Sequence, residues 1–238
     1  AMYVDDVSVR VCWGMPCRIL LPIILKVPGT DPTGFVVTAS AASGGEGRLR
    51  SLLQTPLERG PKADDLPRLA LNARTRRLYV AWEGRLSVLS ADDGVLLAAL
   101  PIGSQVHGLA VDEERDRVYI SERENGELWV LDGATNNLLA SVKGISQLGG
   151  VAVAADRIYL AATGSDELLV LDSGTLQIVE RIPVGRAPYA VAADPGARYV
   201  LVANAGEASV TAIDRFDTQA KTVVSLSGLG HPQDLSLI

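Results

Sequence analysis

The chain has 238 residues, of which 47% are hydrophobic and 21% are charged, with a formal net charge of −6. This composition is typical of a globular protein and excludes a disordered one. The acidic balance and an aromatic content of 5% argue against nucleic acid as a partner, because binding to phosphates requires Lys and Arg. The longest uncharged apolar run, residues 19–25, is far shorter than the roughly 20 residues of a membrane-spanning helix. We therefore expect a globular protein that has no membrane span and binds no nucleic acid.

Residues 1–33 are expected to be an N-terminal remnant strand and a linker. Residues 2–11, MYVDDVSVRV, resemble the last strand of carbohydrate-binding jelly-roll modules, and residues 18–34 read as an apolar tether running into a Gly/Pro linker. Cys12 and Cys17 flank a turn, and both a disulfide and two free thiols remain open for them. No signal peptide is visible, and the jelly-roll resemblance implies the back portion of a longer secreted or surface protein.

From residue 68 onwards the sequence repeats with a period of about 40 residues. The tyrosines of the second apolar run in each unit are spaced by 40 residues and are Tyr79, Tyr119, Tyr159 and Tyr199. Each unit contains four apolar runs that are too short for helices and rich in Val, Leu, Ile and Tyr. Four strands per unit is the content of a propeller blade. We therefore predict an all-β fold, a β-propeller of four-stranded antiparallel blades, with clear units at 68–107, 108–149, 150–189 and 190–233.

The connections between the runs carry turn signals. Asp132, Asp172 and Asp214 each end a third run, where a short acceptor side chain can bind backbone N–H groups two residues further on. The Asn125-Gly126 pair suits a two-residue hairpin turn with positive φ. We interpret these residues as turn-forming and not as metal ligands.

The unit at residues 183–214, PVGRAPYAVAADPGARYVLVANAGEASVTAID, resembles the YVTN-type β-propeller repeat. The match is dense in this unit, fair over 109–183 and thinner over 68–108, so that it covers about 170 of the 238 residues. The resemblance, which extends to YncE-like and NHL-like propellers, implies a propeller fold. Many such proteins are secreted or surface binding modules, and they commonly have about seven blades.

Two interpretations of the ring remain open. Residues 34–67 can supply the outer strands of a degenerate fifth blade, with residues 234–238 as its inner closing strand, because an unpaired edge at the C-terminus would be unfavourable. In the alternative, the chain is part of a larger ring of six to eight blades. We favour about five blade units.

A propeller binds ligands where the loops between each outermost strand and the next innermost strand converge on the central channel. His107 and His231, the two histidines of the chain, fall in these loops and are candidates for pH-dependent or acid–base roles. The full set of ligand-binding candidates in these channel-face loops is Gln105, His107, Gln147, Arg186, Tyr189, His231 and Gln233.

A second set of polar residues lies in the loops between the second and third runs. Glu83, Glu122, Asp166 and Asn204 are weak candidates for a divalent metal, because oxygen ligands suit calcium. Propeller lactonases of the gluconolactonase type resemble this architecture and use such residues around a metal. The competing interpretation is that these side chains solvate hairpin tips.

No nucleophile elbow, phosphate-binding loop or HExxH motif is present in the sequence, so we assign no catalytic residue. The expected function is a secreted, cell-surface or periplasmic propeller that binds a protein, a glycan or a small molecule without catalysis and without a cofactor. The alternatives are a metal-dependent lactonase and a lyase of the streptogramin-cleaving type that would use His107 or His231 with a metal.

Overall fold

The computed structural model describes residues 67–82, 84–103, 105–193 and 198–226. This part of the chain contains sixteen strands in four antiparallel sheets, each of four strands. In every sheet the strands are paired in sequence order. The all-β class and the four-stranded units are therefore confirmed.

The four sheets are called blades 1 to 4. Blade 1 contains β1 (Arg68–Asn72), β2 (Arg77–Trp82), β3 (Arg85–Ser90) and β4 (Leu96–Pro101). Blade 2 contains β5 (Val106–Asp112), β6 (Arg117–Glu122), β7 (Glu127–Asp132) and β8 (Leu138–Val142). Blade 3 contains β9 (Leu148–Ala154), β10 (Arg157–Ala162), β11 (Glu167–Asp172) and β12 (Ile178–Pro183). Blade 4 contains β13 (Pro188–Ala193), β14 (Tyr199–Asn204), β15 (Ser209–Asp214) and β16 (Lys221–Ser225).

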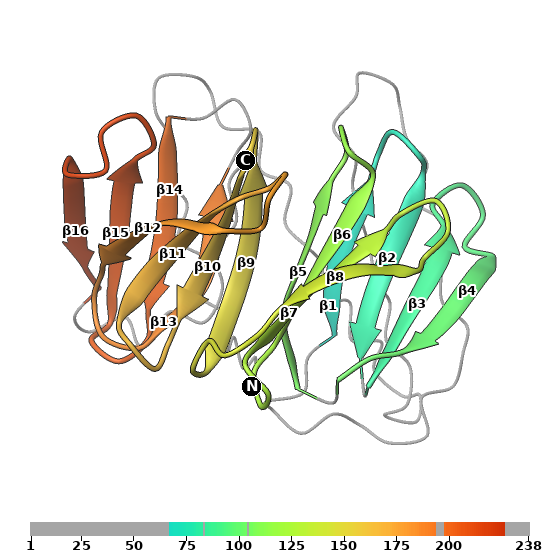
Figure 1. Cartoon of the computed structure of the whole chain (residues 1–238), viewed down its shortest axis with the longest axis horizontal. Helices are drawn as coiled ribbons and strands as arrows, with labels where there is room; N and C mark the ends of the chain where they lie inside the picture. The colour runs from blue at the N-terminus through green and yellow to red at the C-terminus, as the bar shows by residue number, and fades with distance from the viewer. Residues whose placement is uncertain (1–66, 83, 104, 194–197, 227–238) are drawn as a thin grey trace, which may run out of the picture.

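The blades stand side by side in sequence order. The first strand of each blade contacts the first strand of the next, from β1 through β5 and β9 to β13. These strands lie in the middle of the molecule, and β4 and β16 lie at its two far sides (Figure 1). The inner strands of blades 2 to 4 start at Val106, Leu148 and Pro188, each two residues before the predicted start of its unit. The predicted segments 1–33, 34–67 and 234–238, and Cys12 and Cys17, lie outside the described residues, apart from Pro67.

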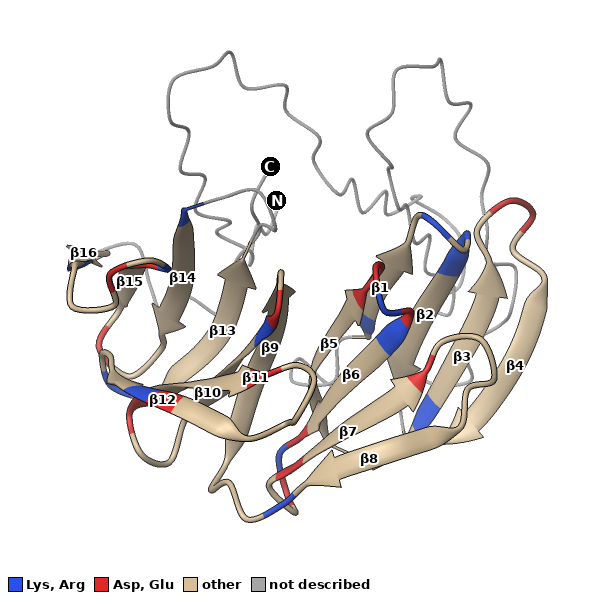
Figure 2. Ribbon diagram, turned by 45° about the horizontal axis from the view of Figure 1, so that its top comes forward, with Lys and Arg blue, Asp and Glu red and all other residues tan. Residues whose placement is uncertain are grey.

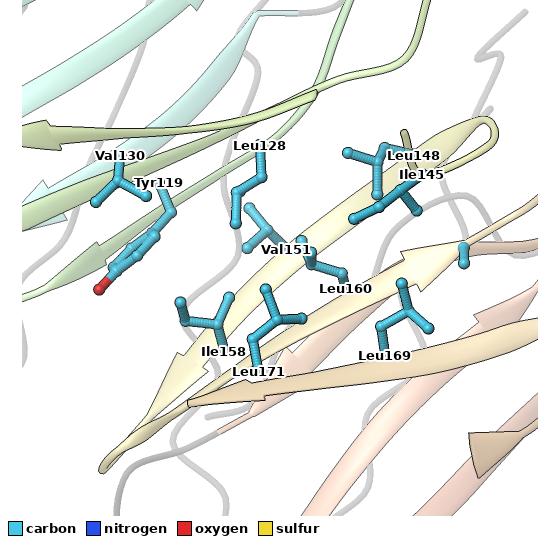
Figure 3. Close-up of a cluster of buried hydrophobic side chains, with 11 residues drawn as sticks. Tyr119, Leu128, Val130, Ile145, Leu148, Val151, Ile158, Leu160, Leu169 and Leu171 are labelled. Carbon is cyan, nitrogen blue, oxygen red and sulfur yellow. The ribbon is translucent and has the colours of Figure 1, made fainter. Parts of the chain in front are cut away.

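The apolar core lies between neighbouring blades. Between blades 2 and 3, Tyr119, Leu128 and Val130 pack against Ile158 and Leu171 (Figure 3). Equivalent clusters join blades 1 and 2 and blades 3 and 4. In the described part of the chain, blades 2 and 3 have a neighbour on each side, so that both faces of their second and third strands are buried.

A tyrosine occupies the same position in the second strand of blades 1 to 3. Tyr79, Tyr119 and Tyr159 are at most 5% exposed. Each is paired with an alanine on the inner strand, which leaves space for the ring; these alanines are Ala70, Ala110 and Ala152. The Tyr79 hydroxyl donates to the backbone oxygen of Gly133 in blade 2 at 3.3 Å. The tyrosines thus join one blade to the next.

The prediction that Tyr199 occupies this position in blade 4 is wrong. Leu201 takes it, because it is paired with Ala192 on the inner strand as each tyrosine is paired with an alanine in the other blades. Tyr199 is paired with Asp214 at the end of β14 and is 40% exposed, whereas Leu201 is 5% exposed. The second strands therefore end at intervals of 40, 40 and 42 residues, at positions 82, 122, 162 and 204.

Two arginines make equivalent hydrogen bonds between blades. Arg77 at the start of β2 donates to the backbone oxygen of Gly133, and Arg117 at the start of β6 donates to that of Ser173 at 2.7 Å. In both pairs the partners are 56 residues apart. The hydrogen bonds between neighbouring blades therefore recur along the chain as the strands within each blade do.

The turn-forming role of the aspartates is confirmed. Asp132 Oδ1 accepts the N–H and the hydroxyl of Thr135 at 2.7 and 2.8 Å, and Asp172 binds Thr175 in the same way. These hydrogen bonds, the backbone one foremost, hold the pKa of both carboxyl groups below its usual value. Asp214 Oδ1 likewise accepts the N–H of Phe216 at 2.9 Å.

The predicted two-residue turn at Asn125-Gly126 is wrong. β6 ends at Glu122 and β7 begins at Glu127, so that four residues connect them. Gly126 has a φ of 59°, whereas Asn125 is not in the positive-φ region. Within this turn the Glu122 carboxylate accepts the N–H of Asn125 at 2.7 Å.

Candidate functional site

The loops that enter the inner strands have the same backbone geometry in three blades. The backbone oxygens of Gln105, Gln147 and Ala187 each accept a hydrogen bond from the connection between the second and third strands of the blade that follows. The donor is the N–H of the first residue of that connection. These donors are Arg123, Thr163 and Ala205, and the distances are 2.9, 3.0 and 3.0 Å. The side chains of Gln105, Gln147 and Arg186 are exposed in these loops. The repeat therefore holds the backbone constant and varies the side chains that it presents.

The inner strands of blades 2, 3 and 4 each start with an irregularity in their pairing. His107 lies between the paired residues Val106 and Gly108, and Tyr189 lies between Pro188 and Ala190. In β9 the pairing of Leu148 and Val151 leaves Gly149 and Gly150 at the same place. Such bulges commonly redirect a side chain next to a functional site. His107, Gly149 and Tyr189 are thus equivalent positions in blades 2, 3 and 4.

The bulges bring two predicted site residues together. The rings of His107 and Tyr189 are 4.8 Å apart, centroid to centroid, and nearly perpendicular at 82°. They come from blades 2 and 4 and meet although blade 3 separates them in sequence. A Cβ atom at Gly149 would lie 2.7 Å from the backbone oxygen of Tyr189. The glycine between the two rings therefore allows this close approach.

His107 lies in a positively charged and partly buried environment. Its Nε2 atom lies 3.4 Å from Nη1 of Arg123. Burial, and then the charges of Arg123 and Arg68, lower the pKa of His107 to about 4. The imidazole is therefore neutral at pH 7. Elsewhere in the described part of the chain, charged residues are mostly in the connecting loops and at strand ends (Figure 2).

This environment predicts a loss of stability in acid. An ordinary histidine in the unfolded chain has a pKa near 6.5, so as the pH falls the unfolded state takes up the proton first. The contribution of His107 to the free energy of unfolding should fall between about pH 6.5 and pH 4 and level off below. With allowance for partial exposure, we expect this fall to be about 2 kcal/mol.

Urea unfolding of the wild type and of His107→Gln at pH 7 and pH 4.5 measures this contribution. The variant should lose less stability than the wild type between the two pH values. His231→Gln serves as the control because it removes the other histidine of the chain. Equal losses in the wild type and in His107→Gln would contradict the assigned environment.

Three of the weak metal candidates, Glu122, Asp166 and Asn204, lie in the described part of the chain, and each forms hydrogen bonds within its own blade or with the loop that leads into the next one. Glu122 is 2% exposed and its two carboxylate oxygens accept the N–H groups of Glu124 and Asn125. Asp166 Oδ1 accepts the N–H of Ala187 at 2.8 Å. Among the described residues, no group of three or more His, Cys, Asp or Glu side chains is placed to hold a metal ion.

In blades 2 and 4, a glycine of the loop that leads into the blade packs on the buried polar residue at the end of the second strand. A Cβ atom at Gly103 would lie 2.2 Å from Cγ of Glu122. A Cβ atom at Gly185 would lie 2.6 Å from Cγ of Asn204, which is fully buried and donates to Ser209 Oγ. The glycine of each Pro-x-Gly sequence thus packs on the side chain that holds the hairpin of the next blade.

Blade 3 lacks both the buried polar residue at the end of the second strand and the glycine that packs on it. Its second strand ends at Ala162, which has no polar side chain. The residue equivalent to Gly103 and Gly185 is Ser146, because Ile145 before it donates to the hairpin oxygen of Gly126 as Ile102 and Val184 donate to their hairpins. The sequence signal for this role was the pairing of Pro-x-Gly with Glu122 or Asn204 about 19 residues later. We interpret Glu122 and Asn204 as structural residues of the hairpins.

A double-mutant cycle tests this packing. Gly103→Ala should lower the free energy of unfolding by about 2 kcal/mol, because the buried Glu122 side chain has to move. In a Glu122→Ala background the same change should cost about 1 kcal/mol less. Urea unfolding of the four proteins gives the coupling, and additive effects would show that the two residues do not share this space.

Three of the predicted site residues lie outside the described residues: Glu83, His231 and Gln233. Of the others, the structure brings His107 and Tyr189 together and leaves Gln105, Gln147 and Arg186 on separate loops. Sequence reasoning missed Arg68, which lies on β1 and acts on His107 through its charge. No signal in the sequence marked Arg68, because its proximity depends on how the blades are packed.

Comparison with known proteins identifies the fold. No protein-family model matches the chain, and no curated protein matches it. Among solved structures, the WD40 repeats of RRP9 match with a TM-score of 0.61 and 15% identity, covering 70% of this chain and 52% of that chain. The fold is a β-propeller. U3-55K also matches with a TM-score of 0.61, at 14% identity, covering 70% of this chain and 53% of that chain.

A hydrazine synthase from Kuenenia stuttgartiensis is similar as well, with a TM-score of 0.60, 16% identity and coverage of 73% of this chain and 53% of that chain. The chain thus spans about half the length of these three solved structures. Identities this low concern the fold, because one propeller scaffold supports many functions. A search of the described residues for a helix long and apolar enough to cross a membrane found none.

Proposed function

We propose that the chain is a non-enzymatic binding scaffold that holds a protein, a glycan or a small molecule on its channel face. The observation that supports this proposal is the repeated loop backbone that presents Gln105, Gln147 and Arg186 from three blades. Binding sites often consist of variable side chains on loops that a rigid scaffold holds in place. The contact between His107 and Tyr189 adds two partly buried rings to the exposed side chains of these loops.

We further propose that the repeats are of the YVTN type and that the protein is secreted or lies on the cell surface. The sequence at residues 183–204, PVGRAPYAVAADPGARYVLVAN, supports this assignment. Two residues of this sequence, Gly185 and Asn204, have a structural role, because the glycine packs on the asparagine side chain. Fractionation of the source cells, followed by detection of the protein with an antibody, tests the location.

The metal-dependent lactonase remains the competing function. In the part of the chain that the structure describes, Glu122, Asp166 and Asn204 are hydrogen-bonded within the fold and do not form a shared site. Lactone hydrolysis measured with added calcium and again after chelation tests it. Turnover that disappears on chelation would overturn the non-enzymatic proposal.

The binding proposal is tested with glycan and peptide arrays and with a small-molecule thermal-shift screen. The wild type is compared with a channel-face variant in which Gln105, Gln147, Arg186 and Tyr189 are replaced by alanine. A matched control carries Arg181→Ala and Lys221→Ala on the exposed outer strands. A ligand of the channel face should bind the wild type and the control but not the variant, and binding that survives in the variant contradicts the proposal.

A further inference from the structure

The centre of the channel face collects hydrogen-bond donors that have no acceptor. Nδ1 of His107 and Nε of Arg68 are both buried and have no hydrogen-bond partner among the described residues. Burying an unsatisfied polar atom is unfavourable, so such atoms in a folded protein call for a partner. Both residues lie at the start of inner strands, in blades 1 and 2.

The contact with Arg123 fixes the role of each histidine nitrogen. A guanidinium group can only donate hydrogen bonds, so Nε2 of His107, at 3.4 Å from Arg123 Nη1, has to be the acceptor. In a neutral imidazole the other nitrogen then carries the proton. Nδ1 of His107 is therefore a buried N–H donor with no acceptor, as is Nε of Arg68.

No carboxylate of the described residues supplies the missing acceptor. The charges that act on His107 come from Arg123 and Arg68, and both are positive. Glu122, which precedes Arg123 in the chain, has its carboxylate oxygens directed to the N–H groups of its own hairpin. Within the described ranges, neither Arg68 nor Arg123 forms an ion pair. The site thus has an excess of donors and of positive charge.

We propose that this site binds a carboxylate group, with Arg68, Arg123 and Nδ1–H of His107 as its donors and the ring of Tyr189 as a wall. A carboxylate has only acceptor atoms and carries the compensating charge, and its hydrogen bonds with arginine are among the stronger ones in proteins. The inference rests on the proposed binding function and names its ligand chemistry. The carboxylate belongs either to a small organic acid or to an acidic side chain of a protein partner.

The test follows the ring nitrogens of His107 by nitrogen-15 NMR of histidine-labelled protein, with His231→Gln to assign the two rings. Succinate is the probe, and uncharged succinamide is its matched control. The free protein should show the neutral Nδ1–H form at pH 7. Succinate should shift the His107 signals in a saturable manner and raise the pKa of the ring, because a carboxylate favours the charged imidazolium.

Variants establish which residues bind the probe. Arg123→Gln and Arg68→Gln should each raise the Kd for succinate roughly tenfold. His107→Phe, followed by thermal shift, should weaken binding to a similar degree, whereas Arg181→Gln on the outer strand β12 should bind like the wild type. Equal binding of succinamide, equal affinity of Arg123→Gln or no response of His107 to succinate would each overturn the inference.

A glutamate hexapeptide separates the two sources of the carboxylate. Affinity at least roughly tenfold above that of succinate would assign the site to an acidic protein segment, and equal affinity would assign it to a small acid. The channel-face variant of the binding test retains Arg68, His107 and Arg123. If succinate fails to bind while array ligands still require the loop side chains, the carboxylate inference alone fails.

Discussion

Gly149→Ala is expected to lower the free energy of unfolding by about 3 kcal/mol. The new Cβ atom would lie 2.7 Å from the backbone oxygen of Tyr189 and 3.1 Å from Cβ of Ala161. A backbone atom cannot move aside as the end of a flexible side chain can, so β9 and β13 would have to separate. The hydrogen bond from Thr163 Oγ1 to the backbone oxygen of Pro188, at 2.6 Å, lies in the same contact and would be strained.

The same substitution should alter the site. Moving β13 away withdraws the Tyr189 ring from His107 and exposes the imidazole, so that the pKa of His107 should rise from about 4 towards its ordinary value. Urea unfolding and NMR titration measure the two effects. Gly174→Ala is the matched control, since a Cβ atom there meets only Asp172 Oδ1 at 3.3 Å. A Gly149→Ala protein as stable as this control would contradict the described packing of the inner strands.

Tyr119→Ala is expected to lower the free energy of unfolding by about 4 kcal/mol. The side chain is fully buried between blades 2 and 3, where it packs in one cluster with Val151 and Ile158 (Figure 3). Its removal leaves a cavity between two sheets whose own hydrogen bonds prevent them from closing the space.

Tyr199→Ala should have a much smaller effect, about 0.5 kcal/mol, because this ring is 40% exposed at the end of β14. Chemical unfolding of both variants compares the same substitution at positions that the 40-residue spacing treats as equivalent. Losses of similar size would support the register predicted from the sequence and would contradict the pairing of Leu201 with Ala212.

The error at Tyr199 shows what the sequence could and could not predict. Strand number, class and the four apolar runs per unit follow from short β-rich segments between turn residues. The register in blade 4 does not, because the connection between its first two strands is longer than in blade 3. A shift of two residues keeps every side chain on the same face of the strand, so the alternation of polar and apolar residues is unchanged.

The site was predicted in part. The position of His107 and Tyr189 at the entry to inner strands followed from the repeat. Their contact did not, because it depends on bulges in two strands and on Gly149 in a third, and bulges leave no clear mark in one sequence. Glu122 and Asn204 were placed correctly at the hairpins, but the glycines packed on them become apparent only when neighbouring blades are seen together.

The pairing of strands in sequence order has a consequence for folding. Each hydrogen-bonded pair among the sixteen described strands is formed by neighbours along the chain, and the four strands of blade 1 end at Pro101. Contacts that are local in sequence favour fast folding, because little loop entropy is lost before they form. During synthesis, blade 1 can form its sheet before blade 2 has been made. The first bonds between blades then require residues only 40 to 56 positions later, so we expect the protein to assemble one blade at a time from its N-terminal side.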